Sequence, residues 1–130
     1  MTTVEDIVKY VEERKEIIGF SPIFEIVMVQ NNGKEQVYEK DGKIIHSGFP
    51  DMGTTSIVGY YYDIDTAICA LNENWGDIRA TIFDGAFILV KFPGLYDSCG
   101  LEQRMWFVWD EEKQGYYQQE EPRIFANLGY

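Results

Sequence analysis

The sequence predicts an α+β fold built around a mainly antiparallel sheet. Strand-like segments follow one another without a helix between them, two Gly-containing turns separate the first of these segments, and helical periodicity is confined to three places. The chain has 130 residues and 45% of them are apolar, which is enough for one self-sufficient core. We therefore expect a single domain over residues 1–130, with a shift in composition near residue 48.

The first predicted element is a helix. Four apolar residues recur at the spacing of one helical face, namely Val4, Ile7, Val8 and Val11. Thr2 or Thr3 can cap this helix, and the acidic residues that follow suit its first turn because they favour the helix dipole. Gly19 is expected to end the helix, and Pro22 keeps it from resuming.

Three strands are predicted next. β-Branched and aromatic residues mark strands at residues 23–30, 36–39 and 43–46. Turn signals at residues 31–33 and at Asp41-Gly42 separate these strands, because Asn, Asp and Gly tolerate positive φ. We expect the three strands to pair as an antiparallel meander.

The second half predicts further strands and two more helices. Asp63 or Asp65 can cap a central helix, and Gly76 is a plausible stop for it. The other segments are strands at 55–62, 86–92, 104–110 and 116–119, an ambiguous stretch at 77–83, and a short C-terminal helix that begins near Pro122. The strand at 86–92 alternates little, so both of its faces are expected to be covered.

The charge balance excludes several classes of function. The chain has 22 acidic and 11 basic residues, a net charge of −11, of which −3 falls in residues 1–43 and −8 in residues 44–130. This balance opposes direct binding to nucleic acid or to an anionic membrane surface. No stretch approaches the roughly 20 apolar residues of a membrane helix, and the acidic N-terminal residues do not resemble a secretory signal. We therefore expect a cytoplasmic protein.

The cysteines and the histidine predict no metal site and no cofactor. Cys69 and Cys99 are the two cysteines, and their separation excludes a zinc-finger spacing. Cys69 falls within the central helical pattern and is expected in the core, whereas Cys99 lies in a polar loop. His46, the single histidine, is expected at the surface end of a strand.

Two groups of residues offer a route to catalysis. Asp63 and Asp65 follow a strand, and in this they resemble the start of phosphotransferases of the haloacid dehalogenase kind, but no later acidic pair with a supporting lysine follows. Cys99 and His46 could form a nucleophile and its base if the fold brings them together. We predict a protein without enzymatic activity and keep a small hydrolase using Cys99 or Asp63/Asp65 as an alternative.

Aromatic rings are expected on both faces of the sheet. Residues 60–62 are consecutive tyrosines, and Trp106 points to the opposite side from Phe107 and Trp109. Helices can cover one face, so the rings on the other face predict a cover by the C-terminal helix, by a second copy of the chain or by another protein.

Short motifs in the second half carry a resemblance to known proteins. They are Gly59-Tyr60-Tyr61, Ala67-Ile68, Asn72-Glu73-Asn74, Asp77-Ile78, Phe92-Pro93-Gly94-Leu95-Tyr96, Trp106-Phe107-Val108-Trp109-Asp110, Gly115-Tyr116 and Pro122. In order and spacing, residues 57–125 resemble a family of small uncharacterised α+β proteins from Gram-positive bacteria, their phages and mobile elements. The resemblance implies a shared fold and brings with it no activity, cofactor or catalytic residue.

We predict a non-enzymatic acidic binding protein that acts by contact with a protein partner with a basic surface. An inhibitor or nucleic-acid mimic directed at a nucleic-acid-handling protein, as in phage counter-defence, is one example. The alternative is a housekeeping domain that forms a homodimer through its aromatic sheet face. The candidate partner-binding residues are Asp63, Asp65, Glu73, Asp77, Trp106, Trp109, Asp110, Glu111 and Glu112.

Overall fold

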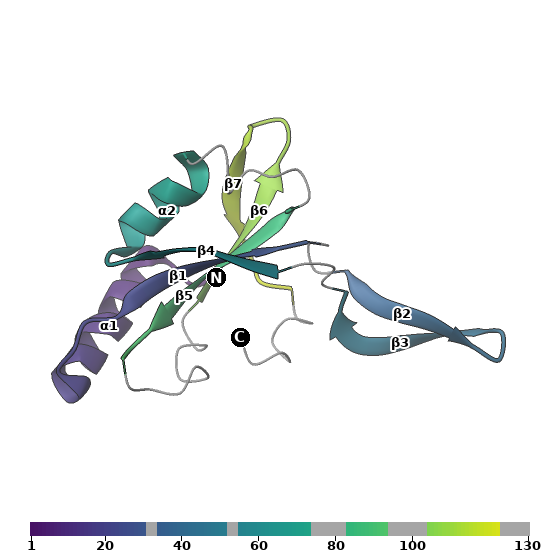
Figure 1. Ribbon diagram of the computed structural model, residues 1–130, viewed down its shortest axis with the longest axis horizontal. Coiled ribbons are helices and arrows are strands. Elements are labelled where there is room, and N and C mark those ends of the chain that lie inside the picture. The colour runs from purple at the N-terminus through teal and green to yellow at the C-terminus, as the bar shows by residue number, and fades with distance from the viewer. Residues whose placement is uncertain (31–33, 52–54, 74–82, 94–103, 123–130) are drawn as a thin grey trace.

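A five-stranded antiparallel sheet forms the centre of the structure, and two helices pack on one of its faces (Figure 1). The computed structural model describes residues 1–30, 34–51, 55–73, 83–93 and 104–122. These residues contain helices α1 (Val4–Ile18) and α2 (Ile64–Glu73) and strands β1 (Ile23–Val29), β2 (Glu35–Lys40), β3 (Lys43–Pro50), β4 (Thr55–Tyr61), β5 (Gly85–Lys91), β6 (Arg104–Asp110) and β7 (Gly115–Gln119). The sheet order is β4-β1-β5-β6-β7. The predicted α+β class and the mainly antiparallel sheet are confirmed.

Helix α1 is fixed at both ends by local hydrogen bonds. The Asp6 N–H donates to the Thr3 hydroxyl oxygen at 3.1 Å, and the Thr3 N–H donates back to the Asp6 carboxylate at 2.9 Å. Gly19 ends the helix in the left-handed region, with φ 82°, and its N–H donates to the Lys15 carbonyl oxygen. Ile7 is fully buried under the helix, whereas Val8 lies at the margin of the apolar stripe and is half exposed.

One long hairpin includes β1 and β4 at its base and β2 and β3 at its end. The strands pair as β1 with β4 and, farther along, as β2 with β3, and between these regions the Asp51 N–H donates to the Lys34 carbonyl oxygen at 2.8 Å. The hairpin turns at Asp41 and Gly42, whose φ angles of 53° and 74° are typical of a type I′ turn. Figure 1 shows β2 and β3 projecting from the sheet, and we call residues 34–51 the arm.

The predicted three-strand meander is wrong. Strand β1 does not pair with β2, because both edges of β1 are occupied by β4 and β5. The cause lies in the side chains: six of the seven residues of β1 are buried, so its neighbours in the sheet must be largely apolar. Strand β2 has the sequence EQVYEK, and pairing it with β1 would place charged side chains in the core.

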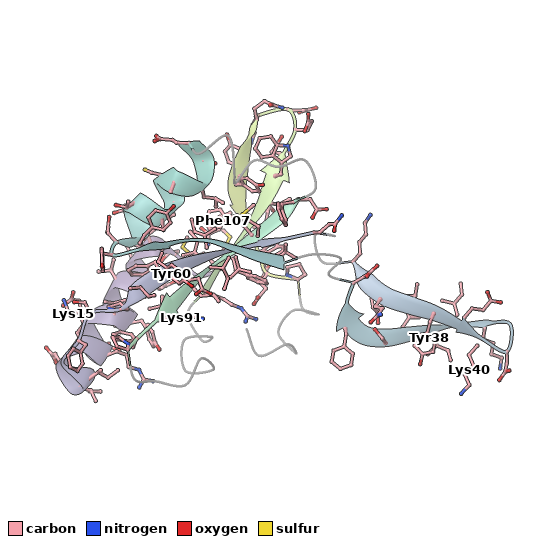
Figure 2. The ribbon with its side chains drawn as sticks, viewed as in Figure 1. Lys15, Tyr38, Lys40, Tyr60, Lys91 and Phe107 are labelled. Atoms are coloured by element: carbon pink, nitrogen blue, oxygen red, sulfur yellow. The ribbon has the colours of Figure 1, made fainter. Side chains whose placement is uncertain are left out.

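The main core lies between the sheet and the helices. Helices α1 and α2 contribute four buried residues, Ile7, Ile64, Ala67 and Leu71, and alternate positions of β1, β5 and β6 contribute Phe24, Ile26, Met28, Ala86, Ile88, Val90, Met105 and Phe107. Figure 2 places Phe107 within this layer. The Tyr116 ring joins the same cluster, and its hydroxyl donates to the Phe83 carbonyl oxygen at 3.1 Å, so its polar group is satisfied.

A second buried cluster lies on the opposite face of the sheet. It consists of Val27, Val29, Phe87, Leu89 and Trp106. The rings of Phe87 and Trp106 are 4.6 Å apart at their centroids, and a Cβ atom on Gly85 would lie 2.5 Å from the indole. Gly85 therefore leaves room for the tryptophan. Strand β5 is buried on both faces, as its lack of alternation predicted.

A buried carboxylate interrupts this second face. Glu25 on β1 is 3% exposed, and its carboxylate lies 3.3 Å from the ammonium group of Lys91 on β5. Figure 2 labels Lys91. The pair links two adjacent strands at the end of the sheet near α1. Removing either partner would leave a charge poorly compensated, so the pair favours this strand alignment over a shifted one.

The predicted core position of Cys69 is wrong, because its side chain is exposed. Helix α2 buries Ile64, Ala67 and Leu71, and a residue two positions after Ala67 lies about 200° around the helix from it. Beyond Pro122, the predicted C-terminal helix lies outside the described residues. Of the helices in the described part, neither has the length and apolar character needed to cross a membrane.

Substitution Gly85→Ala should lower the free energy of unfolding by about 1–3 kcal/mol, because the added methyl group would displace the buried Trp106 indole. Gly59→Ala is the matched control. Its Cβ would lie 2.7 Å from the Tyr61 ring, but that ring is only partly buried and can turn away. Urea unfolding measures both variants. Equal midpoints for the two variants would contradict the packing described.

Candidate interaction surface

Five carboxylates gather where the end of α2 meets the turn between β6 and β7. They are Glu73, Asp84, Asp110, Glu111 and Glu112, and we call this region the acidic end. Asn72 joins the two elements, because its Oδ1 accepts the Tyr116 N–H at 2.9 Å. Asp84 lies beside the turn, since its carbonyl oxygen accepts the Trp109 N–H at 3.0 Å. The fold thus brings together acids that are up to 39 positions apart in the chain.

The turn from β6 to β7 holds its own carboxylates in place. One oxygen of Asp110 accepts the N–H groups of Glu112 at 3.0 Å and Lys113 at 3.1 Å. The Gln114 side chain donates to the Glu111 carbonyl oxygen at 2.6 Å, and Gln114 itself has a φ of 55°. These bonds order the loop, so less conformational entropy is lost when a partner binds it.

Trp109 anchors the same turn to the sheet. Its ring packs edge-on against Tyr116, with centroids 5.1 Å apart, and its indole N–H donates to the Glu111 carboxylate at 2.8 Å. The indole is partly exposed, so it offers an apolar surface beside the acids. Tryptophan is among the residues that most often contribute strongly to binding at protein interfaces.

The acidic end has little compensating charge. Within residues 63–73, 83–84 and 109–117, Lys113 is the one lysine or arginine. Its ammonium group lies 4.9 Å from the centre of the Tyr117 ring. Helix α1, by contrast, mixes five acids with Lys9, Arg14 and Lys15. Among these described residues, the acids therefore outnumber the bases more strongly at the acidic end than on α1.

The structure separates the predicted residues into different locations. Asp63 and Asp65 lie at the start of α2, and a helical rise of about 1.5 Å per residue places them about 15 Å and about 12 Å along the axis from Glu73 at its end. Trp106 is buried in the second cluster, so its indole is not part of the acidic end. Asp77 lies outside the described residues. Glu73, Trp109, Asp110, Glu111 and Glu112 are the predicted residues that come together.

Asp63 has the geometry of a helix cap. Its carboxylate accepts the Thr66 hydroxyl at 2.9 Å and the Thr66 N–H at 3.1 Å. These two bonds, the hydroxyl first, hold the pKa of the Asp63 carboxyl below its ordinary value of 3.8. Both bonds go to the same carboxylate oxygen, Oδ2, and this arrangement matches the capping role predicted for Asp63.

His46 and the arm form a second exposed region. One nitrogen of the His46 ring lies 2.9 Å from the Glu35 carboxylate, which also accepts the Gly48 N–H at 2.8 Å. The bond from Gly48, followed by that from His46, holds the pKa of Glu35 below its ordinary value. The Ser47 hydroxyl donates to the Gln36 carbonyl oxygen and not to His46. Cys99 lies outside the described residues, so its position relative to His46 is not described.

The arm exposes apolar side chains that the sequence interpretation did not single out. Four of its residues are at least half exposed, namely Val37, Tyr38, Ile44 and Phe49. Figure 2 shows Tyr38 and Lys40 on the arm, away from the body of the molecule. The sequence did indicate this exposure, because residues 35–40 are too polar to form a strand with a buried face.

A hollow of about 680 Å³ lies between α1 and the ends of β6 and β7. Residues of both charges line it, including Lys9, Glu13 and Arg104. Arg104 forms an ion pair with Glu121 and lies over the Phe87 ring. Such a mixed lining selects no single class of ligand. Among the described side chains, no three His, Cys, Asp or Glu residues are grouped so that they could hold a metal ion.

Comparison of the chain with protein-family models, with curated proteins and with solved structures finds no match. The resemblance of residues 57–125 to small proteins of Gram-positive bacteria and their phages therefore stays a prediction.

Substitution Thr66→Val should raise the pKa of Asp63 toward 3.8, because the stronger of its two hydrogen bonds is lost while the backbone bond remains. Since the folded-state pKa is the depressed one, the ionised cap stabilises α2 above about pH 4 and loses this effect as the pH falls through the folded-state pKa. Carboxyl NMR titration measures the shift. Thr66→Ser keeps the hydroxyl and should leave the pKa in place; a Thr66→Val pKa equal to that of Thr66→Ser would contradict the assigned cause.

Proposed function

We propose that this chain is a cytoplasmic, non-enzymatic binding protein whose acidic end occupies a basic surface of a protein partner. The observation that carries this proposal is the convergence of Glu73, Asp110, Glu111 and Glu112 on one end of the molecule, with Lys113 as the single cation of the turn. The carboxylates come from two elements that are joined by the bond between Asn72 and Tyr116.

Electrostatics supports fast and selective association by this route. The net charge of −11 attracts a basic partner over distances of up to about a Debye length, and the acidic end gives the attraction a direction. The turn is already ordered by the bonds to Asp110 and Glu111, so binding need not fold it. Trp109 adds apolar contact area in the centre of the charged surface.

The finer form of the proposal is an inhibitor that acts as a nucleic-acid mimic. Carboxylates held on a rigid turn can replace the phosphates that a basic groove normally contacts, since both groups accept charge-assisted hydrogen bonds from Arg and Lys. The resemblance to proteins of phages and mobile elements agrees with a role in counter-defence against a nucleic-acid-handling protein of the host. Asp63 and Asp65, at the other end of α2, lie outside this contact.

Two variants of equal net charge distinguish binding by the acidic end from a general effect of net charge. One carries Glu73→Gln, Glu111→Gln and Glu112→Gln, and the other carries Glu12→Gln, Glu13→Gln and Glu16→Gln on the exposed side of α1. The probe is a fluorescein-labelled peptide of alternating Lys and Arg, and fluorescence anisotropy measures its dissociation constant. The acidic-end variant should bind about tenfold more weakly than the native chain, because each exposed ion pair contributes up to about 1 kcal/mol.

The α1 variant should lose less than about threefold in affinity, since its carboxylates are interspersed with cations. Binding of the native chain should also weaken as NaCl is raised from about 0.1 M to about 1 M, where the Debye length falls to about 3 Å. Equal losses for the two variants, or an affinity that does not respond to salt, would show that the acidic end is not a binding surface.

A further inference from the structure

The segment that forms β3 and β4 is nearly free of charge. Residues 44–62 contain one Asp, Asp51, and no Glu, Lys or Arg, although a quarter of all residues in the chain are charged. The segment includes most of β3, the whole of β4 and Tyr62. In a chain with a net charge of −11, this is a surface that two identical molecules could share without bringing like charges together.

Strand β4 is an edge strand of the central sheet. Its one partner in the described part of the structure is β1, which leaves the other edge of its backbone open. Natural edge strands are usually guarded by Lys, Pro or a bulge, and β4 has no charged residue and no proline. The feature of β4 that could disfavour pairing along this edge is a single shift in its register with β1, between Ile26 and Val27. Ile57 and Tyr60, which lie along this edge, are more than half exposed.

The arm has apolar side chains that it cannot bury alone. Ile44 is 71% exposed and Phe49 is 52% exposed, and a two-stranded hairpin is at best marginally stable in water. The arm is next to β4 in the chain, because β3 ends at Pro50 and β4 begins at Thr55. An apolar cover for the arm would therefore be expected beside the open edge of β4.

A groove suited to such a segment lies at the other end of β4. It has a volume of about 200 Å³ and lies between α1 and the start of α2, where Val8, Pro22 and Tyr62 contribute to its lining. Tyr62 is 89% exposed and Val8 is 48% exposed. Charged residues of both signs also line it, namely Asp63 and the pair of Glu12 and Lys15, whose charged groups are 3.9 Å apart.

We propose that two copies of this chain associate about a two-fold axis, with β4 pairing antiparallel to β4 of the second copy and each arm lying against the second copy. Antiparallel pairing places Thr55 of one copy opposite Tyr61 of the other, because the strand is paired with itself in reverse. The arm, which precedes Thr55, then runs past Tyr61 of the second copy toward its Tyr62 and its groove. In this one symmetric contact, the open edges of the two β4 strands pair, and each arm is covered by the second copy beside its groove.

A second copy fits these features better than another protein does. The same edge serves both sides of a two-fold contact, and the absence of charge removes the local repulsion that would oppose self-association. The inference does not depend on the proposed function, because the acidic end is on other elements. The two associations also respond oppositely to salt: screening strengthens contact between two molecules of charge −11 and weakens contact with a basic partner.

Analytical ultracentrifugation of the full chain tests the proposal. A species of twice the 15.1 kDa chain mass is expected, and its dissociation constant should fall by about threefold or more when NaCl is raised from about 0.1 M to about 1 M. Ile57→Lys should weaken the dimer by about tenfold or more, because it places two like charges near the two-fold axis. The matched control is Tyr117→Lys, at an exposed position of β7, which should leave the dissociation constant unchanged.

Ile44→Ser tests the arm and should weaken the dimer by about threefold or more, since an apolar contact with the second copy is removed. Hydrogen exchange gives an independent measurement: the amides of residues 55–61 should exchange more slowly above the dissociation constant than below it. A monomer under all conditions, a dimer that Ile57→Lys leaves intact, one that is indifferent to Ile44→Ser or one that salt dissociates would each overturn the proposal. None of these outcomes would alter the expected binding of the basic peptide.

Discussion

The structure depends on the burial of β1 between two neighbouring strands and two apolar layers. Its edges are hydrogen-bonded to β4 and β5, and its side chains point alternately into the main core under the helices and into the second cluster around Trp106. A strand in this position requires largely apolar neighbours, apart from the ion pair of Glu25 and Lys91. For that reason the chain leaves β1, travels outward through the arm and returns as β4 before the sheet can continue. The arm is separate from the central sheet because β2 is too polar to pair with β1.

Local patterns in the sequence predicted the elements well, and long-range pairing poorly. The cap at Thr3, the stop at Gly19 and the turn at Asp41-Gly42 depend on neighbouring residues, so their signals are contained in a few positions. The predicted meander was wrong because the choice between β2 and β4 as the partner of β1 depends on which strand tolerates burial. Turn signals do not indicate which strand can be buried. Cys69 failed for a related reason, since an apolar run does not specify which side of α2 faces the sheet.

The candidate site was predictable in its composition and not in its arrangement. Glu111 and Glu112 are adjacent in sequence, and their place in a polar turn could be anticipated. Their proximity to Glu73 follows from a hydrogen bond between Asn72 and Tyr116, 44 positions apart, which no spacing rule reveals. Trp106 and Trp109 illustrate the same limit: both are on β6, but the alternation of the strand directs one ring into the second cluster and leaves the other at the surface.

The separation of the arm from the central sheet bears on how this chain can vary. Because β2 and β3 pair with each other in a separate two-stranded sheet, two residues added to each of these strands would lengthen the arm by about 7 Å while each side chain kept its facing direction. The packing of the hydrophobic core would not change, because the added residues would lie in the arm. Related sequences can therefore differ in the length of the arm, and we expect such differences to be insertions or deletions of an even number of residues.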